Sequence, residues 1–393
     1  MKKLWILTEM FFPEETATAY ILTKIADHLA GDMDVNVICG PASYEGKERI
    51  QDAAVLNERV KIHRVSGTVF GKNRLISRVF RFLSLTWKLT REFRKRISDG
   101  DEVLVVTNPA PILLSVARLR SRKSFSLNLL VHDVFPENTI PAGIIKSDKS
   151  LFYRTLKSLF DRAYAKADRL IVLGRDMEDV VTGKIGEDGK KKIVIIENWA
   201  DLDNINPKQR VDDGRIVLQY AGNLGRVQGL LELLKCVKDS SNQQLDMCFY
   251  GGGAVEEDLK NFVEINKMDN VRFYGNYRRN EQNVILNSCD LAIVTLAEGM
   301  YGLGVPSKTY NILAAGKPIL YIGDDRSEIA LMIKESGIGY VFKPDELEDV
   351  TSFLKNLSEE KRAELIQMGI KARLLAENSY SEKVILNKYS EIL

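Results

Sequence analysis

The stretch Leu218–Gly229 reads LQYAGNLGRVQG, an apolar run that leads into a glycine-rich turn and then into a helical segment. A strand that ends at Gly222 and Gly225 lets backbone N–H groups approach an anion closely, because glycine tolerates dihedrals that a Cβ forbids. The helix expected from about Leu230 directs the positive end of its dipole to the same point. Arg226 adds a permanent charge with forked donors suited to phosphate oxygens. The stretch predicts a unit that holds a diphosphate, and an ordinary tight turn is the alternative.

Length and composition narrow the class of protein. The chain has 393 residues, 45% hydrophobic and 28% charged, which is enough for two well-buried domains. No apolar run approaches the roughly 20 residues that cross a bilayer. The N-terminus begins like a signal peptide, but Thr8 and Glu9 interrupt its apolar run, so a buried strand is predicted there. The four cysteines and three histidines are scattered, which argues against a disulfide framework and a zinc site and favours a cytoplasmic protein.

Charge is distributed unequally along the chain. Residues 1–200 hold 33 Lys and Arg against 25 Asp and Glu, whereas residues 201–393 hold 23 against 29. A net charge of +8 in one half and −6 in the other indicates two halves with different partners.

Strand-like runs alternate with helix-length segments throughout, which is the pattern of parallel sheets covered by helices. The predicted strands are Lys2–Leu7, Val35–Ile38, Val60–Arg64, Glu102–Val106, Ser126–Val131, Arg169–Leu173, Lys192–Ile196, Ile216–Tyr220, Leu245–Tyr250, Val271–Tyr274, Leu291–Val294, Pro318–Ile322 and Gly339–Phe342. A polar stretch, KQRVDDG, interrupts the alternation. We therefore predict an α/β protein with two doubly wound, Rossmann-like domains, 1–205 and 206–379, facing a cleft. A final helix within 380–393 is expected to pack back on the first domain.

Eight segments in register resemble glycosyltransferase family 4 enzymes. In the second half they are YAGNLGRVQG (220–229), FYGGG (249–253), NVRFYG (270–275) and GVPSKTYNILAAGKP (304–318). In the first half they are FFPEETATAYILTKIADHLA (11–30), VHDVFPENTI (131–140), ADRLIVLGRDM (167–177) and IIENWADLDNINP (195–207). This resemblance covers essentially the whole chain. It implies the GT-B fold, a reaction that retains anomeric configuration, and no requirement for a metal or other cofactor.

The resemblance also implies a set of donor-binding residues in the second half. Gln228 stands where many relatives carry a second cation, so Lys308 is expected to supply it. The alternative is a proline-initiated helix, Thr309–Ala315, with an ordinary surface lysine at its start. The residues expected to bind the donor diphosphate and nucleoside are Gly222, Asn223, Arg226, Gly251, Gly252, Tyr277, Pro306, Ser307 and Lys308.

One departure concerns the donor sugar and ribose. Many relatives have two glutamates separated by seven residues, whereas here the second position is Asn311 and the place eight residues earlier is Leu303. Asn311 remains able to hydrogen-bond a hydroxyl. Glu298 and Glu328 are further candidates for these contacts.

The first half supplies the remaining candidate catalytic and acceptor-binding residues. His132 and Asp133 follow directly on a predicted strand, at the carboxyl end where site residues belong. We predict that they act with Arg226 and Lys308, although a purely structural histidine is the alternative. The candidate acceptor-binding residues are Glu14, Glu15, Thr16 and Glu137. The D-L-D sequence at Asp201–Asp203 is interpreted as a solvated turn.

The segment Lys72–Arg96 carries nine basic residues, one acid and four large aromatics, with apolar residues near helical spacing. Such a helix favours an anionic membrane surface. The alternative is a helix packed on its own sheet with a solvated basic face. No recognised nucleic-acid motif accompanies the basic residues. The candidate membrane residues are Arg78, Arg81, Trp87, Lys88, Arg91 and Arg94.

Together with the family resemblance, these observations imply a retaining, metal-independent glycosyltransferase on the inner face of the cell membrane. It would transfer a sugar from a UDP- or GDP-sugar to a lipid-linked, undecaprenyl-diphosphate glycan for a capsule, an O-antigen or an exopolysaccharide. The alternatives are a UDP-sugar epimerase of the GT-B type and a catalytically silent module that binds sugar nucleotides.

Overall fold

The chain folds into two compact units in a computed structural model that describes residues 2–14, 16–42, 56–66, 75–211 and 213–393. The first unit comprises Met1–Thr139, Ile145–Ile196 and Leu386–Leu393, and the second comprises Ile140–Ile144 and Glu197–Ile385. The main change of unit therefore comes at 196/197 rather than at 205/206. The chain end returns to the first unit, as predicted, but from residue 386 rather than 380.

A seven-stranded, wholly parallel sheet forms the first unit, in the order β3-β2-β1-β4-β5-β6-β7. The strands are β1 Lys3–Leu7, β2 Asp34–Cys39, β3 Val60–Arg64, β4 Glu102–Val106, β5 Ser126–Leu130, β6 Arg169–Val172 and β7 Ile193–Ile195. The seven strands predicted for this half are confirmed, with each end within one residue.

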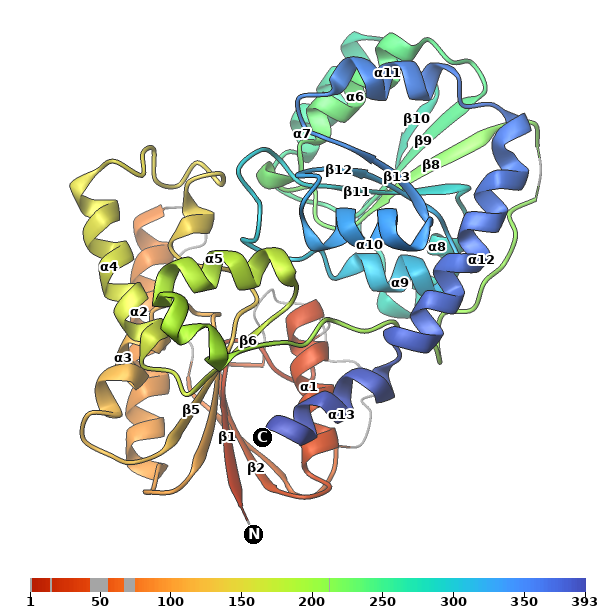
Figure 1. Ribbon diagram of the computed structural model, residues 1–393. Helices are drawn as coiled ribbons and strands as arrows, with labels where there is room; N and C mark the ends of the chain where they lie inside the picture. The colour runs from red at the N-terminus through yellow and green to blue at the C-terminus, as the bar shows by residue number, and fades with distance from the viewer. Residues whose placement is uncertain (1, 15, 43–55, 67–74, 212) are drawn as a thin grey trace. The chain divides into compact units, whose positions relative to one another are not determined.

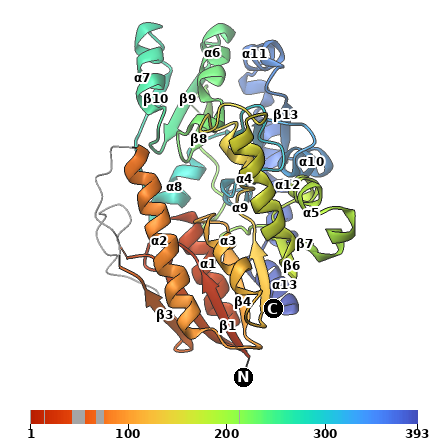
Figure 2. The ribbon, with the colours of Figure 1, turned by 90° about the vertical axis from the view of Figure 1, so that its left-hand side faces the viewer.

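Helices cover both faces of the first sheet, which is why its central strands are almost continuously apolar. The helices are α1 Ala17–Leu29, α2 Leu75–Arg96, α3 Ile112–Leu119, α4 Leu151–Ala165 and α5 Arg175–Ile185. Helices α2, α3 and α4 lie side by side on one face (Figure 2). Helix α1 lies on the other face beside the end of α13, Glu382–Ile392 (Figure 1). The last two residues bond back to this unit, because Lys2 donates to the Leu393 carbonyl and Arg169 to the Ile392 carbonyl.

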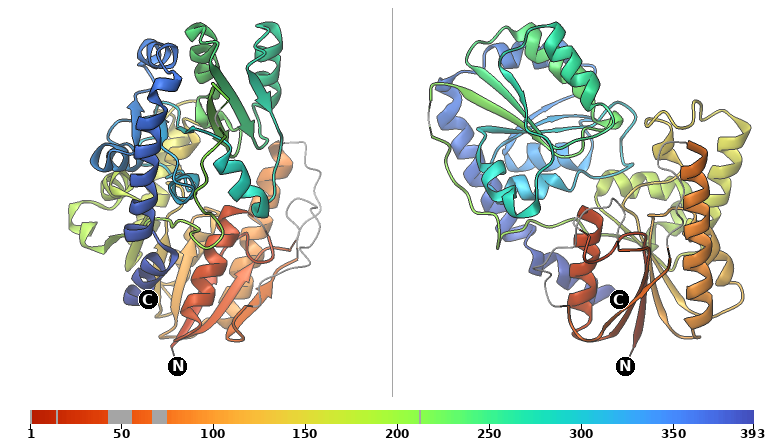
Figure 3. Two further views of the ribbon diagram at one scale, coloured as in Figure 1. Left: turned by 90° about the vertical axis from the view of Figure 1, so that its right-hand side faces the viewer. Right: turned by 180° about the vertical axis from the view of Figure 1, so that it is seen from behind.

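A six-stranded parallel sheet forms the second unit, in the order β10-β9-β8-β11-β12-β13. Its strands are β8 Ile216–Ala221, β9 Leu245–Tyr250, β10 Val271–Phe273, β11 Leu291–Thr295, β12 Ile319–Ile322 and β13 Gly339–Phe342. Helices on one face are α6 Leu230–Ser240, α7 Glu256–Ile265 and α11 Leu347–Lys355. Helices on the other face are α8 Gln282–Asn287, α9 Lys308–Ala314, α10 Glu328–Ser336 and α12 Arg362–Ser379. Figure 3 shows the two helical layers with the sheet between them.

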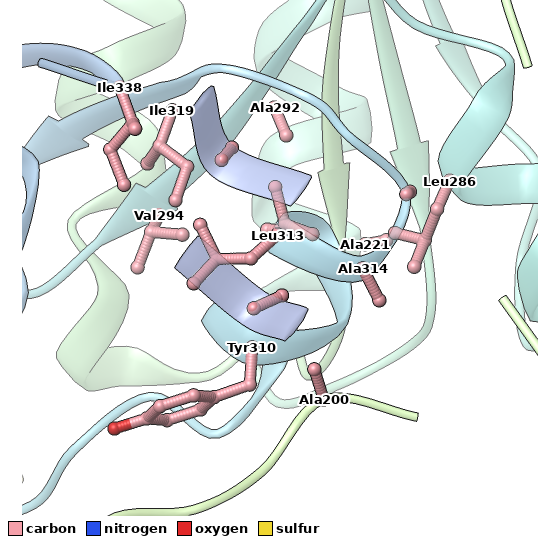
Figure 4. Close-up of a cluster of buried hydrophobic side chains, with 14 of the residues drawn as sticks. Ala200, Ala221, Leu286, Ala292, Val294, Tyr310, Leu313, Ala314, Ile319 and Ile338 are labelled. Atoms are coloured by element: carbon pink, nitrogen blue, oxygen red, sulfur yellow. The ribbon is translucent and has the colours of Figure 1, made fainter. Parts of the chain in front are cut away.

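Helix α9 packs into the hydrophobic core on its face of the second sheet. Leu313 and Ala314 are fully buried against β12 and the segment that contains Ala200 (Figure 4). The ring of Tyr310 is also fully buried and meets the Tyr380 ring edge-on, with 5.1 Å between centroids. Because α9 is held on this side by packing, the position of its first residue is fixed.

Candidate active site

Three glycines end three neighbouring strands of the second sheet. Gly222, Gly251 and Gly275 have φ angles of +149°, +118° and +72°, which disfavour any residue with a Cβ. The Gly222 N–H donates to the Tyr250 carbonyl at 2.8 Å, and a Cβ built on Gly251 would lie 2.0 Å from the Gly222 carbonyl oxygen. The turns therefore touch backbone to backbone. The strand–turn–helix unit predicted from Leu218–Gly229 is confirmed.

The polar residues of this turn differ in where they point. Asn223 and Arg226 are exposed, so both side chains are open to a ligand. Gln228 instead folds against its own turn, because its Oε1 is buried and a Cβ on Gly225 would lie 2.5 Å from that atom. Among the described residues, Gln228 Oε1 has no hydrogen-bond partner. Arg226 is the exposed cation of the turn.

Lys308 brings a second cation to the same turn. Helix α9 begins at Lys308, directly after Pro306 and Ser307. A Cβ on Gly222 would lie 3.5 Å from Lys308 Cδ, so the lysine stem runs alongside the turn. Lys308 Nζ is buried and, among the described residues, forms no hydrogen bond. Burial holds the pKa of this amino group well below its ordinary value. The alternative of an ordinary surface lysine is wrong.

Tyr220 is the neighbour that the sequence did not single out. Its ring is 1% exposed, and its centroid lies 3.3 Å from Lys308 Nζ, within cation–π range. Its hydroxyl donates to the Asn223 carbonyl at 2.9 Å, which fixes the ring under the turn. The available signal was an aromatic residue near a strand end, two positions before Gly222.

Two further candidate donor residues lie on adjacent turns of the same edge. The Gly252 carbonyl accepts the Leu224 N–H at 3.0 Å, which ties the turns after β8 and β9 together. Tyr277 is half-buried and meets the Tyr250 ring edge-on at 6.4 Å. The structure thus brings Gly222, Gly251, Gly252 and Tyr277 to one edge of the second sheet, and their ligand contacts stay a prediction.

Asn311 is partly engaged in holding the chain itself. Its Oδ1 accepts the Asp201 N–H at 3.1 Å. Asp201 is 5% exposed and pairs with Arg279 at 3.1 Å, so the solvated-turn interpretation is wrong at Asp201, although Asp203 is exposed. The tertiary neighbours of Asp201 are distant in sequence, which is why the local pattern could not reveal them. Asn311 as a ribose ligand stays a prediction.

The two candidate glutamates have different surroundings. Glu328 is 5% exposed in the first turn of α10, whereas Glu298 is exposed. Glu298 lines a cavity of about 310 Å³ past the carboxyl ends of β11, β12 and β13. Its lining residues are Ala297, Glu298, Gly299, Asp324, Asp325, Arg326, Lys343, Pro344 and Asp345. The hydrogen bond from Arg326 holds the pKa of Asp324 below its usual range. Glu298 is therefore the more accessible of the two.

In the first unit, His132 and Asp133 follow β5 as predicted. Both of their backbone N–H groups donate to Thr107 Oγ1, at 3.1 and 3.3 Å. His132 Nε2 is buried without a hydrogen-bond partner among the described residues, and burial lowers the pKa of this histidine to about 4. Desolvation raises the pKa of Asp133. His132 is therefore neutral at pH 7, and Thr107, at the end of β4, is a positioning residue that the sequence did not reveal.

The candidate acceptor residues include two with evident structural contacts. Thr16 caps α1, because its Oγ1 accepts the Ala19 N–H at 3.2 Å and donates to Met10 Sδ at 3.5 Å. Glu137 is held by the buried Lys184 at 2.7 Å. Glu14 is half-buried. Glu15 lies outside the described residues. Acceptor binding by these residues stays a prediction.

The comparisons with known proteins identify the family. The family model described as "Glycosyltransferase Family 4" matches residues 19–204, and that described as "Glycosyl transferases group 1" matches residues 201–374. "Probable glycosyltransferase WbjE" of Pseudomonas aeruginosa is 34% identical over 99% of this chain and 97% of that protein. The chain belongs to glycosyltransferase family 4. WcaI of Escherichia coli K12, named for colanic acid biosynthesis, is 20% identical over 63% of this glycosyltransferase and 62% of its own length.

A solved structure shares the fold of this glycosyltransferase. Anabaena HepE, in a complex with UDP, superposes with a TM-score of 0.70 at 13% identity and covers 100% of this chain and 99% of its own. The two parallel-sheet units are those of the GT-B architecture, as predicted. The family-4 enzyme is thus a hexosyltransferase-type glycosyltransferase with the GT-B fold.

Helix α2 of the glycosyltransferase has a buried apolar stripe and, outside it, two exposed apolar side chains. Its buried stripe consists of Leu85, Leu89 and Phe93, spaced four residues apart. Leu83 and Trp87 lie outside that stripe and are 53% and 60% exposed. Trp87 is one of the candidate membrane residues, and its contact with a membrane stays a prediction.

The basic candidate membrane residues of α2 differ in their contacts. Arg91 lies over the exposed Trp87 ring at 5.4 Å, and Arg94 is exposed. Lys88 donates to the Ser66 carbonyl at 2.9 Å. The side chains of Arg78 and Arg81 lie outside the described residues.

Three further observations concern the cysteines, membrane-spanning helices and metal ligands of the glycosyltransferase. All four cysteines are buried and free. Within the described ranges, no helix is both long and apolar enough to span a bilayer. In the same ranges no three His, Cys, Asp or Glu side chains gather as metal ligands would. Independence from a metal stays a prediction.

Proposed function

We propose that this glycosyltransferase is a retaining, metal-independent enzyme that transfers a sugar from UDP or GDP to a lipid-linked glycan in surface-polysaccharide synthesis. The observation that carries the proposal is the buried, unpartnered amino group of Lys308 beside the Gly222 turn. Burying an amino group without a partner is unfavourable unless something compensates it. A donor diphosphate supplies that compensation.

The chemistry follows from the leaving group. When a nucleoside diphosphate departs, negative charge develops on its phosphate oxygens, and preorganised donors aimed there lower the barrier. The backbone N–H groups of the Gly222 turn, Arg226 and Lys308 are the proposed donors for this task. His132, neutral at pH 7, and Asp133 are the proposed residues for the reacting sugar and acceptor.

Nucleotide binding tests the proposed phosphate contacts directly. Arg226→Ala is expected to weaken UDP or GDP binding about 10- to 100-fold by calorimetry, because a charge-assisted hydrogen bond contributes about 1.5–3 kcal/mol. Arg272→Ala, an exposed arginine on β10, is the matched control and should bind as the natural chain does. If Arg226→Ala binds UDP and GDP with unchanged affinity, Arg226 does not contact the diphosphate.

Product analysis tests the reaction. The enzyme is incubated with UDP- and GDP-sugars and a lipid-linked glycan extract, and the anomeric configuration of the product is read by NMR. A retained configuration that survives EDTA supports the proposal, whereas inversion or complete loss with EDTA contradicts it. Free sugar and free nucleotide without acceptor would identify the epimerase. Tight binding with no product from any extract would identify a silent binding module.

The membrane part of the proposal rests on the exposed side of α2. Trp87 and Leu83 are open to solvent with Arg91 and Arg94 beside them, which suits the interface of an anionic bilayer. The acceptor is expected to reach the enzyme from the inner leaflet.

Vesicle sedimentation tests this surface. The triple variant Trp87→Ser, Arg91→Glu, Arg94→Glu is expected to leave phosphatidylglycerol vesicles and to keep UDP affinity. A matched control on α4 carries Phe152→Ser, Arg154→Glu and Arg162→Glu, because Phe152 is 67% exposed and both arginines are exposed. If the α4 control leaves the vesicles and the α2 variant stays bound, the membrane contact lies on α4 and the proposal for α2 is wrong.

A further inference from the structure

The amino group of Lys308 has an unusual environment for a buried lysine. It lies 3.3 Å from the centroid of the Tyr220 ring and forms no hydrogen bond to any described residue. Its stem runs past Gly222, where any side chain would come within contact distance. The ring face of Tyr220 is thus its closest stabilising neighbour, and the ring is itself fixed by the bond from its hydroxyl to the Asn223 carbonyl.

The titratable groups around Lys308 are aromatic rather than acidic. Tyr220 on β8 faces it directly, and Tyr277, after β10, lies near enough to Tyr220 to raise the pKa of its hydroxyl. Burial is the cause of the lowered pKa of Lys308, and no described charged residue contributes to that shift. The glycine turn and the buried Thr309 and Tyr310 of α9 complete the surroundings with groups that do not titrate near neutrality. No described carboxylate therefore balances an ammonium at this place before a ligand arrives.

We propose that Tyr220 is a positioning residue that holds the Lys308 amino group against the Gly222 turn, and that this amino group takes up a proton from solvent when a nucleoside diphosphate binds. The inference rests on the proposed function, because it requires the diphosphate to lie at this turn. It adds a residue and a coupled proton that the family match does not assign.

The physical reason is a change of counter-charge. In the free protein a neutral amine over a ring face avoids the large cost of an unpaired buried ammonium. A bound diphosphate brings negative oxygens to the same turn, and an opposite charge within about 4–6 Å favours the charged form of the amine. The ammonium is then held between the phosphate oxygens and the electron-rich ring face. One proton moves from solvent to Nζ, and no covalent bond of the nucleotide changes.

Titration calorimetry with UDP measures the proton directly. At pH 8 the second phosphate ionisation, near pH 6, is complete, so proton uptake reports the protein. The binding enthalpy is measured in buffers of different ionisation enthalpy. The natural chain is expected to take up close to one proton for each UDP bound. Lys308→Arg is expected to bind UDP without uptake, because a guanidinium stays charged in either state.

Two isosteric rings at position 220 test the positioning role. Tyr220→Phe keeps the ring face and is expected to retain proton uptake and UDP affinity within about twofold. Pentafluorophenylalanine at the same position keeps the shape but reverses the charge distribution of the ring, so UDP affinity should fall about tenfold, which corresponds to a cation–π contribution of about 1.4 kcal/mol. Because the two rings have similar volume, the two variants are expected to fold equally well, and a difference in UDP affinity reports the charge distribution of the ring.

The outcomes separate this inference from the proposed function. UDP binding without proton uptake, or equal uptake by Lys308→Arg, overturns the coupled proton while leaving the donor site intact. Equal UDP affinity with the phenyl and pentafluorophenyl rings overturns the role of Tyr220. If neither UDP nor GDP binds the natural chain, the proposed function fails and the inference fails with it.

Discussion

Lys184 and Lys308, one in each unit, have buried amino groups with opposite surroundings. Lys184 of α5 has a side chain that is 1% exposed, and its Nζ pairs with Glu137 at 2.7 Å and with Asp161 at 2.6 Å. Lys308 of α9 has a ring face and no described hydrogen-bond partner. Both lie near a tyrosine ring, since Lys184 Nζ is 4.9 Å from the Tyr164 centroid. The difference between them is the presence of carboxylates.

This comparison separates a structural cation from one that is available to a ligand. The charge of Lys184 is balanced within the protein, so an added anion gains little there. Lys308 is buried without such a balance, and an anionic ligand is the partner that would satisfy it. Glu137, a candidate acceptor residue, is one of the carboxylates that balance Lys184.

The largest expected effect is the loss of the paired lysine. Lys184→Met should lower the free energy of unfolding by about 3 kcal/mol, because it leaves two carboxylates without their buried counter-charge. Urea unfolding measures this change, and UDP affinity should stay the same. Lys157→Met is the matched control, since Lys157 pairs with the same carboxylates but is 35% exposed. It should cost less than about 1 kcal/mol. Similar losses for the two variants would contradict the distinction.

His132 extends the comparison to an unpaired group in the first unit. Its pKa is about 4 in the folded chain against 6.5 ordinarily, so the unfolded chain binds more protons between these values. Stability that is present above pH 6.5 is therefore lost as the pH falls toward 4, by about 3 kcal/mol in total. Urea unfolding between pH 7 and pH 4 should show this loss, and His132→Gln should remove it. Parallel pH curves for the two proteins would mean that His132 is paired in solution.

Removing the unpaired lysine should have the opposite sign to the loss of Lys184. Lys308→Met replaces a buried polar group without a partner by an apolar chain of similar length, so nucleotide-free stability should rise by about 1 kcal/mol. Urea unfolding without nucleotide measures it. A fall of several kcal/mol would place Lys308 in the same structural class as Lys184.

The smallest expected effect concerns Thr16. Thr16→Ala removes the cap of α1 and should lower stability by about 1 kcal/mol. Transfer kinetics at a temperature where both proteins are folded should be unchanged. A raised KM for the acceptor with unchanged stability would restore the predicted acceptor role of Thr16 and weaken the division between structural and ligand-binding groups.

Much of the fold could be predicted because its signals are local. Strands such as Val60–Arg64 and Leu245–Tyr250 were predicted with their observed bounds, since each is a short run bounded by turn residues. The change of unit at 196/197 was placed too late, because the polar stretch near residue 208 lies inside the second unit. Polarity marks exposure, and exposed loops occur within domains as well as between them.

The candidate site could be predicted only in part. The glycine turn and the proximity of Lys308 to it follow from two segments that both end at the carboxyl edge of one sheet. Three tertiary contacts could not be predicted: the approach of the Tyr220 ring to Lys308, the hydrogen bonds of two N–H groups to Thr107 Oγ1, and the burial of Asp201. Each depends on a partner whose approach is set by the packing of whole elements.

The sequence by itself determined two parallel sheets, the glycine turn after β8 and the residue types that meet a diphosphate, because periodicity and backbone freedom are properties of short segments. The tertiary structure alone decided which charges are balanced. It paired Lys184 with Glu137 and Asp161, left Lys308 against a ring, and turned Trp87 outward. The physical reason is that the energy of a buried charge depends on neighbours brought together by folding, and no local pattern records them.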